Sequence, residues 1–171
     1  MSIIPDRSFH YLKRELALAV DESLYASLEG STDSELPFYV TLTFGLQEDP
    51  PAAVERMVGF VEEVGRCHGT EHPIQMTIGT TDGKSLWAFR YSSERKPRSL
   101  DYSTDVSTLR ELYPDRPRLH EVSDETRIVV SEPLVDLPGA WNEVPESGCG
   151  VVRDGEDELR PFRPVDSGNG G

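Results

Sequence analysis

The stretch Gly30-Ser31-Thr32-Asp33-Ser34-Glu35 begins the segment around which the rest of the chain is organised. Thr32 and Glu35 have the spacing of a capping box. In such a box the hydroxyl accepts the backbone N–H three residues on, and the glutamate reaches back to the first residue. An apolar run follows at once and ends at Gly45, a residue type that commonly stops helices. The stretch therefore predicts a helix over 33–44.

Asp33 falls in the first turn of that helix, where unpaired backbone N–H groups and the positive end of the helix dipole favour an ionised carboxylate. Such a corner offers an anion to a ligand ammonium, beside backbone donors for a ligand carboxylate. A free amino acid presents both groups. Asp33, with Thr32 beside it, is thus a candidate amino-acid site, and the alternative is a well-capped helix with no further role.

Helical spacing of apolar residues recurs on both sides of this stretch. It predicts an amphipathic helix over 7–19, a short helical turn over 21–28, and a third helix that starts after Asp49 and ends near His68. Each of the two longer helices carries one apolar face. We expect the helix over 7–19 to bury one side only.

The second half of the chain is dominated by strand patterns. The clearest is a hairpin of 74–80 and 86–91 around the turn residues Asp82-Gly83. Arg90 and Tyr91 end this hairpin, and we expect them to have a surface role rather than to contact a ligand. Further strands are predicted over 99–103 and, buried, over 126–130, with a closing hairpin of 150–152 and 159–162; a short helix is predicted over 106–112, a loop over 114–117, and a solvated turn for the acidic run 154–158. The order of elements predicts an α+β fold with antiparallel sheets.

Length and charge limit the possible functions. The 171 residues suit one domain, and a net charge of -14 disfavours nucleic acid and anionic membrane surfaces as partners. No apolar run is long enough to cross a bilayer, and no signal-peptide pattern opens the chain, so a cytoplasmic location is expected. Two cysteines, Cys67 and Cys149, make no disulfide framework.

Cys67, His68 and His72 form a C-H-x3-H cluster of zinc-ligand types. A stable site needs further ligands, which only the distant His10 or His120 could provide, so we expect neither a metal nor another cofactor. No base is placed beside either cysteine, so a small hydrolase that uses Cys or Ser ranks far below the readings that follow.

Several motifs together resemble the class II glutamine amidotransferases, in particular the small type that carries only the glutamine-cleaving unit. The resemblance extends in order from about residue 9 to residue 164. Its motifs are Glu-Gly-Ser-Thr-Asp-Ser-Glu at 29–35, Leu-Thr-Phe-Gly-Leu at 42–46, Asp-Pro-Pro at 49–51, Tyr-Ser-Ser at 91–93, Val-Val-Ser-Glu-Pro-Leu at 129–134 and Trp-Asn-Glu-Val-Pro at 141–145.

The resemblance implies that Asp33 binds the α-amino group of glutamine. It also implies the α-β-β-α sandwich of amino-terminal nucleophile hydrolases. The family's nucleophile is an amino-terminal Cys after the initiator Met, and its Asn-Gly oxyanion pair and substrate Arg precede the position of Ile3. This chain opens Met1-Ser2-Ile3.

We therefore expect residues 1–164 to form an N-terminally truncated amidotransferase domain, inactive alone, with no catalytic residue of its own and a disordered tail over 165–171. Its partners would be glutamine and a separate amino-terminal chain. Self-association through open sheet edges is a further possibility that the missing strands imply. The alternative function is a non-catalytic amino-acid-binding or assembly module.

Overall fold

The computed structural model describes residues 3–4, 6–30, 32–133 and 139–165, which divide into two compact units. The first contains the described residues up to Met76, together with Tyr91–Pro97 and 162–165. The second contains Thr77–Arg90 and the described part of Arg98–Pro161. The boundary falls inside two strands, so each of these strands contributes residues to both units.

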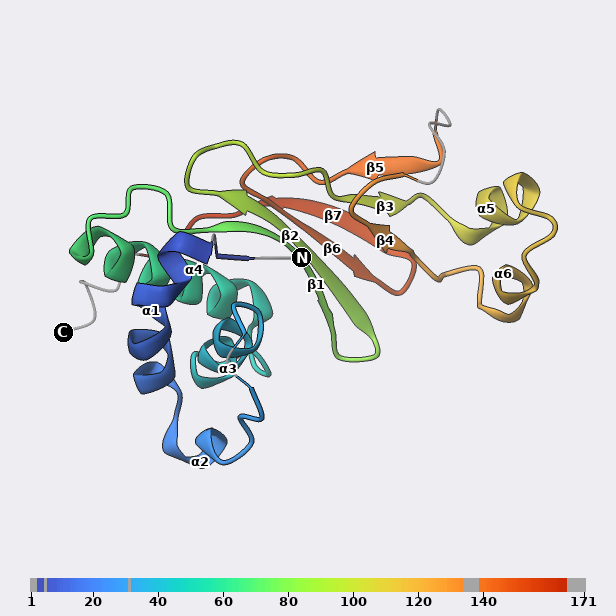
Figure 1. Ribbon diagram of the computed structural model, residues 1–171. Coiled ribbons are helices and arrows are strands. Elements are labelled where there is room, and N and C mark those ends of the chain that lie inside the picture. Colours follow the sequence, from blue (N-terminus) through green and yellow to red (C-terminus); the bar gives the residue numbers. More distant parts are fainter. Residues whose placement is uncertain (1–2, 5, 31, 134–138, 166–171) are drawn as a thin grey trace. The chain divides into compact units, whose positions relative to one another are not determined.

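The first unit is built on four helices: α1 (Asp6–Ala19), α2 (Glu22–Tyr25), α3 (Glu35–Thr43) and α4 (Pro50–Cys67). Figure 1 shows them grouped together, in colours from blue to green. α1, α3 and α4 contact one another pairwise. The apolar faces expected for the two long helices are confirmed: Leu12, Leu16 and Val20 are buried at α1, and Val54, Met57, Val58 and Val61 on α4.

The end of the described chain packs on α4. The backbone N–H groups of Arg163 and Val165 donate to the side chain and the carbonyl of Glu55, at 2.7 and 3.1 Å. A Cβ at Gly59 would lie only 1.8 Å from the Val165 carbonyl oxygen, so a glycine is needed for this close approach. Residues 166–171, most of the expected tail, lie outside the described residues.

The second unit contains most of a four-stranded sheet in the order β1-β2-β6-β7 and a three-stranded sheet in the order β4-β3-β5. The strands are β1 (Gln75–Thr81), β2 (Ser85–Ser92), β3 (Asp101–Ser103), β4 (Val129–Val130), β5 (Trp141–Glu143), β6 (Gly148–Arg153) and β7 (Glu156–Pro161). β6 pairs antiparallel with β2 and β7, and β3 pairs antiparallel with β4 and β5. The α+β class with antiparallel sheets is confirmed.

The core of this unit contains Ala88, Leu100, Tyr102, Val144 and Val152. Two short helices, α5 (Val106–Leu112) and α6 (Pro117–Glu121), lie beside each other and are drawn in yellow in Figure 1. Asp105 begins α5 by accepting the Thr108 N–H at 2.7 Å, as an N-cap residue does.

Most predicted elements are present, with four differences. The strand expected over 126–130 is reduced to Val129–Val130, which are half-buried rather than buried. The loop expected over 114–117 leads into α6, and β5 was not predicted. The acidic run is not a solvated turn: only Asp154 and Gly155, both with positive φ, make the turn, and Glu156 to Glu158 belong to β7.

Within the described residues, no helix is long and apolar enough to cross a membrane.

Candidate functional site

The predicted amino-acid corner lies in the first unit, in the turn that leads into α3. The Thr32 hydroxyl accepts the Glu35 N–H at 3.1 Å, as the capping box predicts. The return contact differs. Glu35 Oε1 accepts the N–H groups of Glu29 and Gly30, at 2.9 and 3.0 Å, and so reaches further back than Thr32. The turn is therefore held by two side chains: the Thr32 hydroxyl accepts from its carboxyl-terminal end, and the Glu35 carboxylate accepts from its amino-terminal end.

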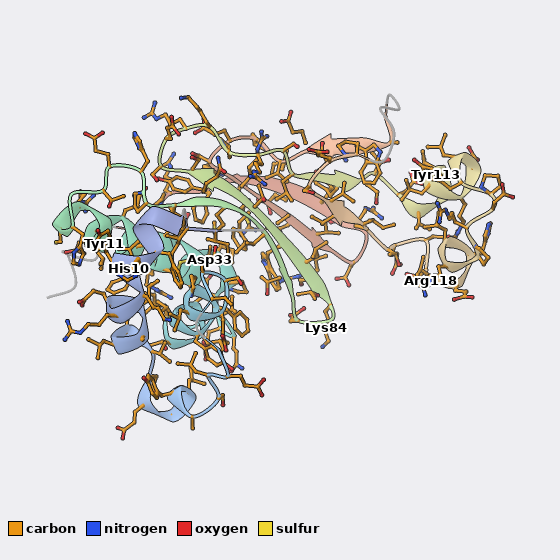
Figure 2. The ribbon with its side chains drawn as sticks, viewed as in Figure 1. His10, Tyr11, Asp33, Lys84, Tyr113 and Arg118 are labelled. Carbon is orange, nitrogen blue, oxygen red and sulfur yellow. The ribbon has the colours of Figure 1, made fainter. Side chains whose placement is uncertain are left out.

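Asp33 is half-buried in this turn and holds a segment far away in sequence. Its Oδ2 accepts the backbone N–H groups of Ile3 and Ile4, at 2.5 and 3.3 Å. Ile3 and Ile4 are themselves buried, and the Ile3 carbonyl accepts the Gln75 N–H at 2.9 Å. Figure 2 labels Asp33 among the helices of this unit.

The two carboxylate oxygens of Asp33 therefore differ. Oδ2 is engaged by two backbone donors, whereas Oδ1 has no hydrogen bond among the described residues. Two N–H donors on one oxygen hold the carboxylate in a fixed orientation. The remaining oxygen can accept from a ligand ammonium without breaking this arrangement.

Sequence reasoning placed Asp33 and Thr32 in one turn but did not find the contribution of Ile3 and Ile4. Their side chains look like ordinary core residues, and it is their backbone that contacts Asp33, across 29 and 30 residues of chain. No local pattern carries such a contact. The hydrogen bonds that hold the Asp33 carboxylate therefore depend on tertiary structure.

Cys67, His68 and His72, the cluster of zinc-ligand types at which no metal was expected, are not part of any group of three or more possible ligands among the described residues. The His68 ring instead stacks on Tyr11, with ring centroids 6.4 Å apart, and Tyr11 meets His10 edge-on at 5.5 Å. Cys67 is an exposed free thiol and Cys149 a buried one. The rings of His10 and His68 thus both pack against Tyr11.

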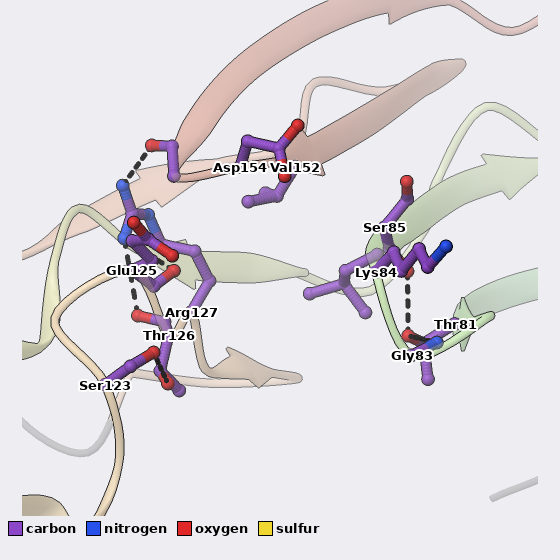
Figure 3. Close-up of a pocket in the computed structure, with 12 residues that line it drawn as sticks. Thr81, Gly83, Lys84, Ser85, Ser123, Glu125, Thr126, Arg127, Val152 and Asp154 are labelled. Atoms are coloured by element: carbon purple, nitrogen blue, oxygen red, sulfur yellow. Dashed lines mark hydrogen bonds between the residues drawn. The ribbon is translucent and has the colours of Figure 1, made fainter.

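The second unit contains a pocket of about 580 Å³ between the β1–β2 turn, the loop before β4 and the β6–β7 turn. Its lining includes Lys84 and Arg127, but also Glu125 and Asp154. Figure 3 shows the Lys84 side chain pointing away from Arg127, whose guanidinium donates to the Gly155 carbonyl at 2.5 Å. Two basic and two acidic side chains thus line this pocket, and the Arg127 guanidinium is bound to backbone.

Arg90, for which a surface role was expected, is half-buried and connects three segments of the second unit. Its side chain is 13% exposed and donates to Glu143 Oε1 at 2.5 Å, with further bonds to the carbonyls of Val144 and Arg98 at 2.8 Å each. A guanidinium can donate to three acceptors at once, which explains how most of the Arg90 side chain can be covered here.

Asp101 lies opposite Glu143 in the neighbouring strand, and its environment raises its pKa. Burial raises the pKa of the Asp101 carboxyl, the charge of Glu143 raises it further, and Arg90 offsets part of the rise. A carboxyl whose pKa is raised on folding stabilises the fold while protonated. That stability is lost as the pH rises through the folded-state pKa. Ionised Asp101 is therefore a cost to the fold at neutral pH.

Replacing Asp101 by asparagine should raise the melting temperature at pH 7, and the gain should shrink as the pH falls towards 4. Thermal melts of both proteins across this range measure it. Asp105→Asn is the matched control with the opposite sign, because hydrogen bonds from Ser107 and Thr108 lower the pKa of Asp105. That variant should lose stability at pH 7. A gain for Asp101→Asn that is the same at every pH would contradict the argument.

Comparisons with known proteins complete the description of the site. No family model matches the chain, and none of the curated proteins matches it. Among solved structures, a glutamine aminotransferase class-II domain protein from Silicibacter pomeroyi is similar, at 28% sequence identity and a TM-score of 0.78. The similarity covers 97% of this chain and 66% of that chain, so this chain spans about two-thirds of its relative's length.

Proposed function

We propose that this chain forms the glutamine-anchoring part of a class II glutamine amidotransferase, with Asp33 as the acceptor for the α-ammonium group of glutamine. The observation that carries the proposal is the Asp33 carboxylate itself, with Oδ2 held by two backbone N–H groups and Oδ1 without a hydrogen bond among the described residues. The similarity to a glutamine aminotransferase class-II domain protein over 97% of the chain supports it. Thr32 belongs to the same site and holds its turn.

This class uses an amino-terminal Cys as its nucleophile, whereas Ser2 follows Met1 in this sequence. In the resembled enzymes an amino-terminal Cys thiolate attacks the side-chain amide of glutamine and ammonia leaves. Water then cleaves the acyl-enzyme to release glutamate. Donors aimed at the oxyanion contribute about a hundred- to a thousandfold in rate. We propose that a further segment supplies both the nucleophile and the donors, and that this chain supplies the anchor and the scaffold.

The isolated chain should release no ammonia from glutamine above the rate without protein. Joined to a segment that carries an amino-terminal Cys and an Asn-Gly pair, encoded upstream, it should release ammonia and glutamate in equal amounts. A coupled assay of both products measures this. Changing that Cys to Ala in the joined protein is the control, and should abolish both products.

Two outcomes would contradict the proposal. The first is ammonia release by the isolated chain that survives substitution of both Cys67 and Cys149. The second is a joined, folded protein that neither binds nor cleaves glutamine. Binding without cleavage would instead support the alternative, a non-catalytic amino-acid-binding module that uses the same Asp33 corner.

A further inference from the structure

Glu35 connects the start of α3 to the residues that precede Asp33, with its backbone and with its side chain. Its backbone N–H donates to the hydroxyl of Thr32, the residue directly before Asp33, at 3.1 Å. Its Oε1 reaches further back and accepts the N–H groups of Glu29 and Gly30. In the sequence, Asp33 lies between Glu35 and all three of these partners. The position of Asp33 therefore depends on Glu35.

Gly30 leaves room for the Glu35 carboxylate. A Cβ at Gly30 would lie 2.6 Å from Glu35 Oε2, closer than two such atoms can pack. The φ of Gly30 lies outside the left-handed region, so its backbone conformation does not itself require a glycine. A side chain at this position would instead push the carboxylate of Glu35 away from its two donors.

The carboxylates of Asp33 and Glu35 have different partners. Asp33 Oδ2 accepts from Ile3 and Ile4, which lie 30 and 29 positions away in the sequence. Glu35 Oε1 accepts from residues six and five positions before it. Hydrogen bonds from backbone N–H groups to a carboxylate are among the stronger ones in proteins. Glu35 thus fixes the turn locally, and Asp33 joins the turn to a distant segment.

We propose that Glu35 is a positioning residue for glutamine. It holds the turn so that Asp33 Oδ1 meets the α-ammonium group, and it does not contact the ligand itself. The inference rests on the proposed function of Asp33. A binding group keeps its geometry only when neighbouring residues hold it, and Glu35 does so through its hydrogen bonds. A side chain that accepts the same two N–H groups should therefore replace it.

Substitutions of Glu35 in the joined, active protein test this role. Glu35→Ala removes the acceptor and should raise KM for glutamine about tenfold, within the range of couplings in one hydrogen-bond network, with less change in kcat. Glu35→Gln keeps an oxygen that can accept the same N–H groups, so its KM should stay close to that of the unmodified protein. Glu22→Ala, at the first position of α2, is the matched control and should leave KM unchanged.

A double-mutant cycle with Asp33→Asn separates positioning from a general loss of structure. Glu35→Ala should add little to the KM of the Asp33→Asn variant, because the charge that Glu35 positions is already gone. A residue that only stabilised the fold would raise KM by the same factor in both backgrounds.

Gly30→Ala tests the same contact without removing the charge of Glu35. The new Cβ should displace the Glu35 carboxylate, so KM should rise as it does in Glu35→Ala. The substitution should have no further effect once Glu35 is alanine, because no carboxylate is left to displace.

Amide hydrogen exchange of the full chain adds a measurement that needs no activity. Glu35→Ala should speed exchange at Ile3 and Ile4, whose N–H groups donate to Asp33, although both lie far from Glu35 in the sequence. Glu35→Gln and Glu22→Ala should leave this exchange unchanged.

The outcomes separate the two proposals. An unchanged KM in Asp33→Asn would remove the glutamine anchor and with it the proposed function. Where Asp33→Asn does raise KM, the role of Glu35 alone is overturned by any of three results. These are an unchanged KM in Glu35→Ala, a loss in Glu35→Gln as large as in Asp33→Asn, and effects of Glu35→Ala that are equal in both backgrounds. Unchanged exchange at Ile3 and Ile4 in Glu35→Ala would also overturn it.

Discussion

Replacing Asp33 by asparagine in the joined, active protein is expected to weaken glutamine binding by about 30- to 150-fold. The estimate takes about 2–3 kcal/mol for a hydrogen bond between an ammonium and a carboxylate. Asparagine keeps a carbonyl oxygen that can accept the N–H groups of Ile3 and Ile4, so the turn and its neighbours should stay in place. The substitution thus removes the charge and little else.

The effect should appear in KM for glutamine and less in kcat, since the ammonium lies away from the amide that reacts. Glutaramic acid, which is glutamine without its α-amino group, isolates the contact. As a competitor it should bind the unmodified protein far more weakly than glutamine does. The Asp33→Asn variant should bind glutaramic acid and glutamine with equal affinity. Asp21→Asn, at the cap of α2 in the same unit, is the matched control. An unchanged KM, or a preference for glutamine that survives the substitution, would remove Asp33 from the site.

Gly59→Ala should lower the free energy of unfolding by about 1–3 kcal/mol, the usual range for forcing an atom into a packed site. The new Cβ would lie 1.8 Å from the Val165 carbonyl oxygen and 2.6 Å from its carbonyl carbon. Either α4 or the segment at 163–165 must then shift. The segment is held to Glu55 by only two hydrogen bonds, one to the side chain and one to the carbonyl, so its displacement is the easier response. Denaturant titration of both proteins measures the loss.

Removing the clashing atoms provides the control. In a chain that ends at Pro164, Gly59→Ala should no longer destabilise the protein. It should instead raise the free energy of unfolding by about 1 kcal/mol, because alanine favours a helix interior more than glycine does. The two substitution energies should therefore differ in sign. If Gly59→Ala destabilises the shortened chain as much as the full one, the contact with Val165 is not the cause.

Much of the fold could be read from local pattern. The helical spacing of Leu12, Leu16 and Val20 and of the apolar residues from Val54 to Val61 identified α1 and α4, because burial of one helix face leaves a period of 3.6 in the sequence. Asp82-Gly83 marked the β1–β2 turn, where Asp82 accepts the N–H groups of Lys84 and Ser85. These signals are local, so they survive without knowledge of the rest of the chain.

The failures share a cause. β5 is three residues long, and its pairing with β3 joins segments almost forty residues apart, so neither length nor alternation announces it. The run from Glu156 to Glu158 is acidic and was expected in a turn, yet it forms β7 because β6 offers a complete set of backbone partners. Pairing across the sheet outweighs the poor strand propensity of acidic residues.

The sequence by itself determined the capped turn at 30–35, the helices around it and the identity of Asp33 as the carboxylate to examine, because capping and amphipathic spacing depend on neighbours a few residues apart. Only the tertiary structure decided which oxygen of Asp33 is held, since its donors are backbone groups of Ile3 and Ile4. It alone also decided that Gly59 must lack a side chain and that the acidic run 156–158 belongs to a strand. These three features depend on segments that meet only after the chain has folded.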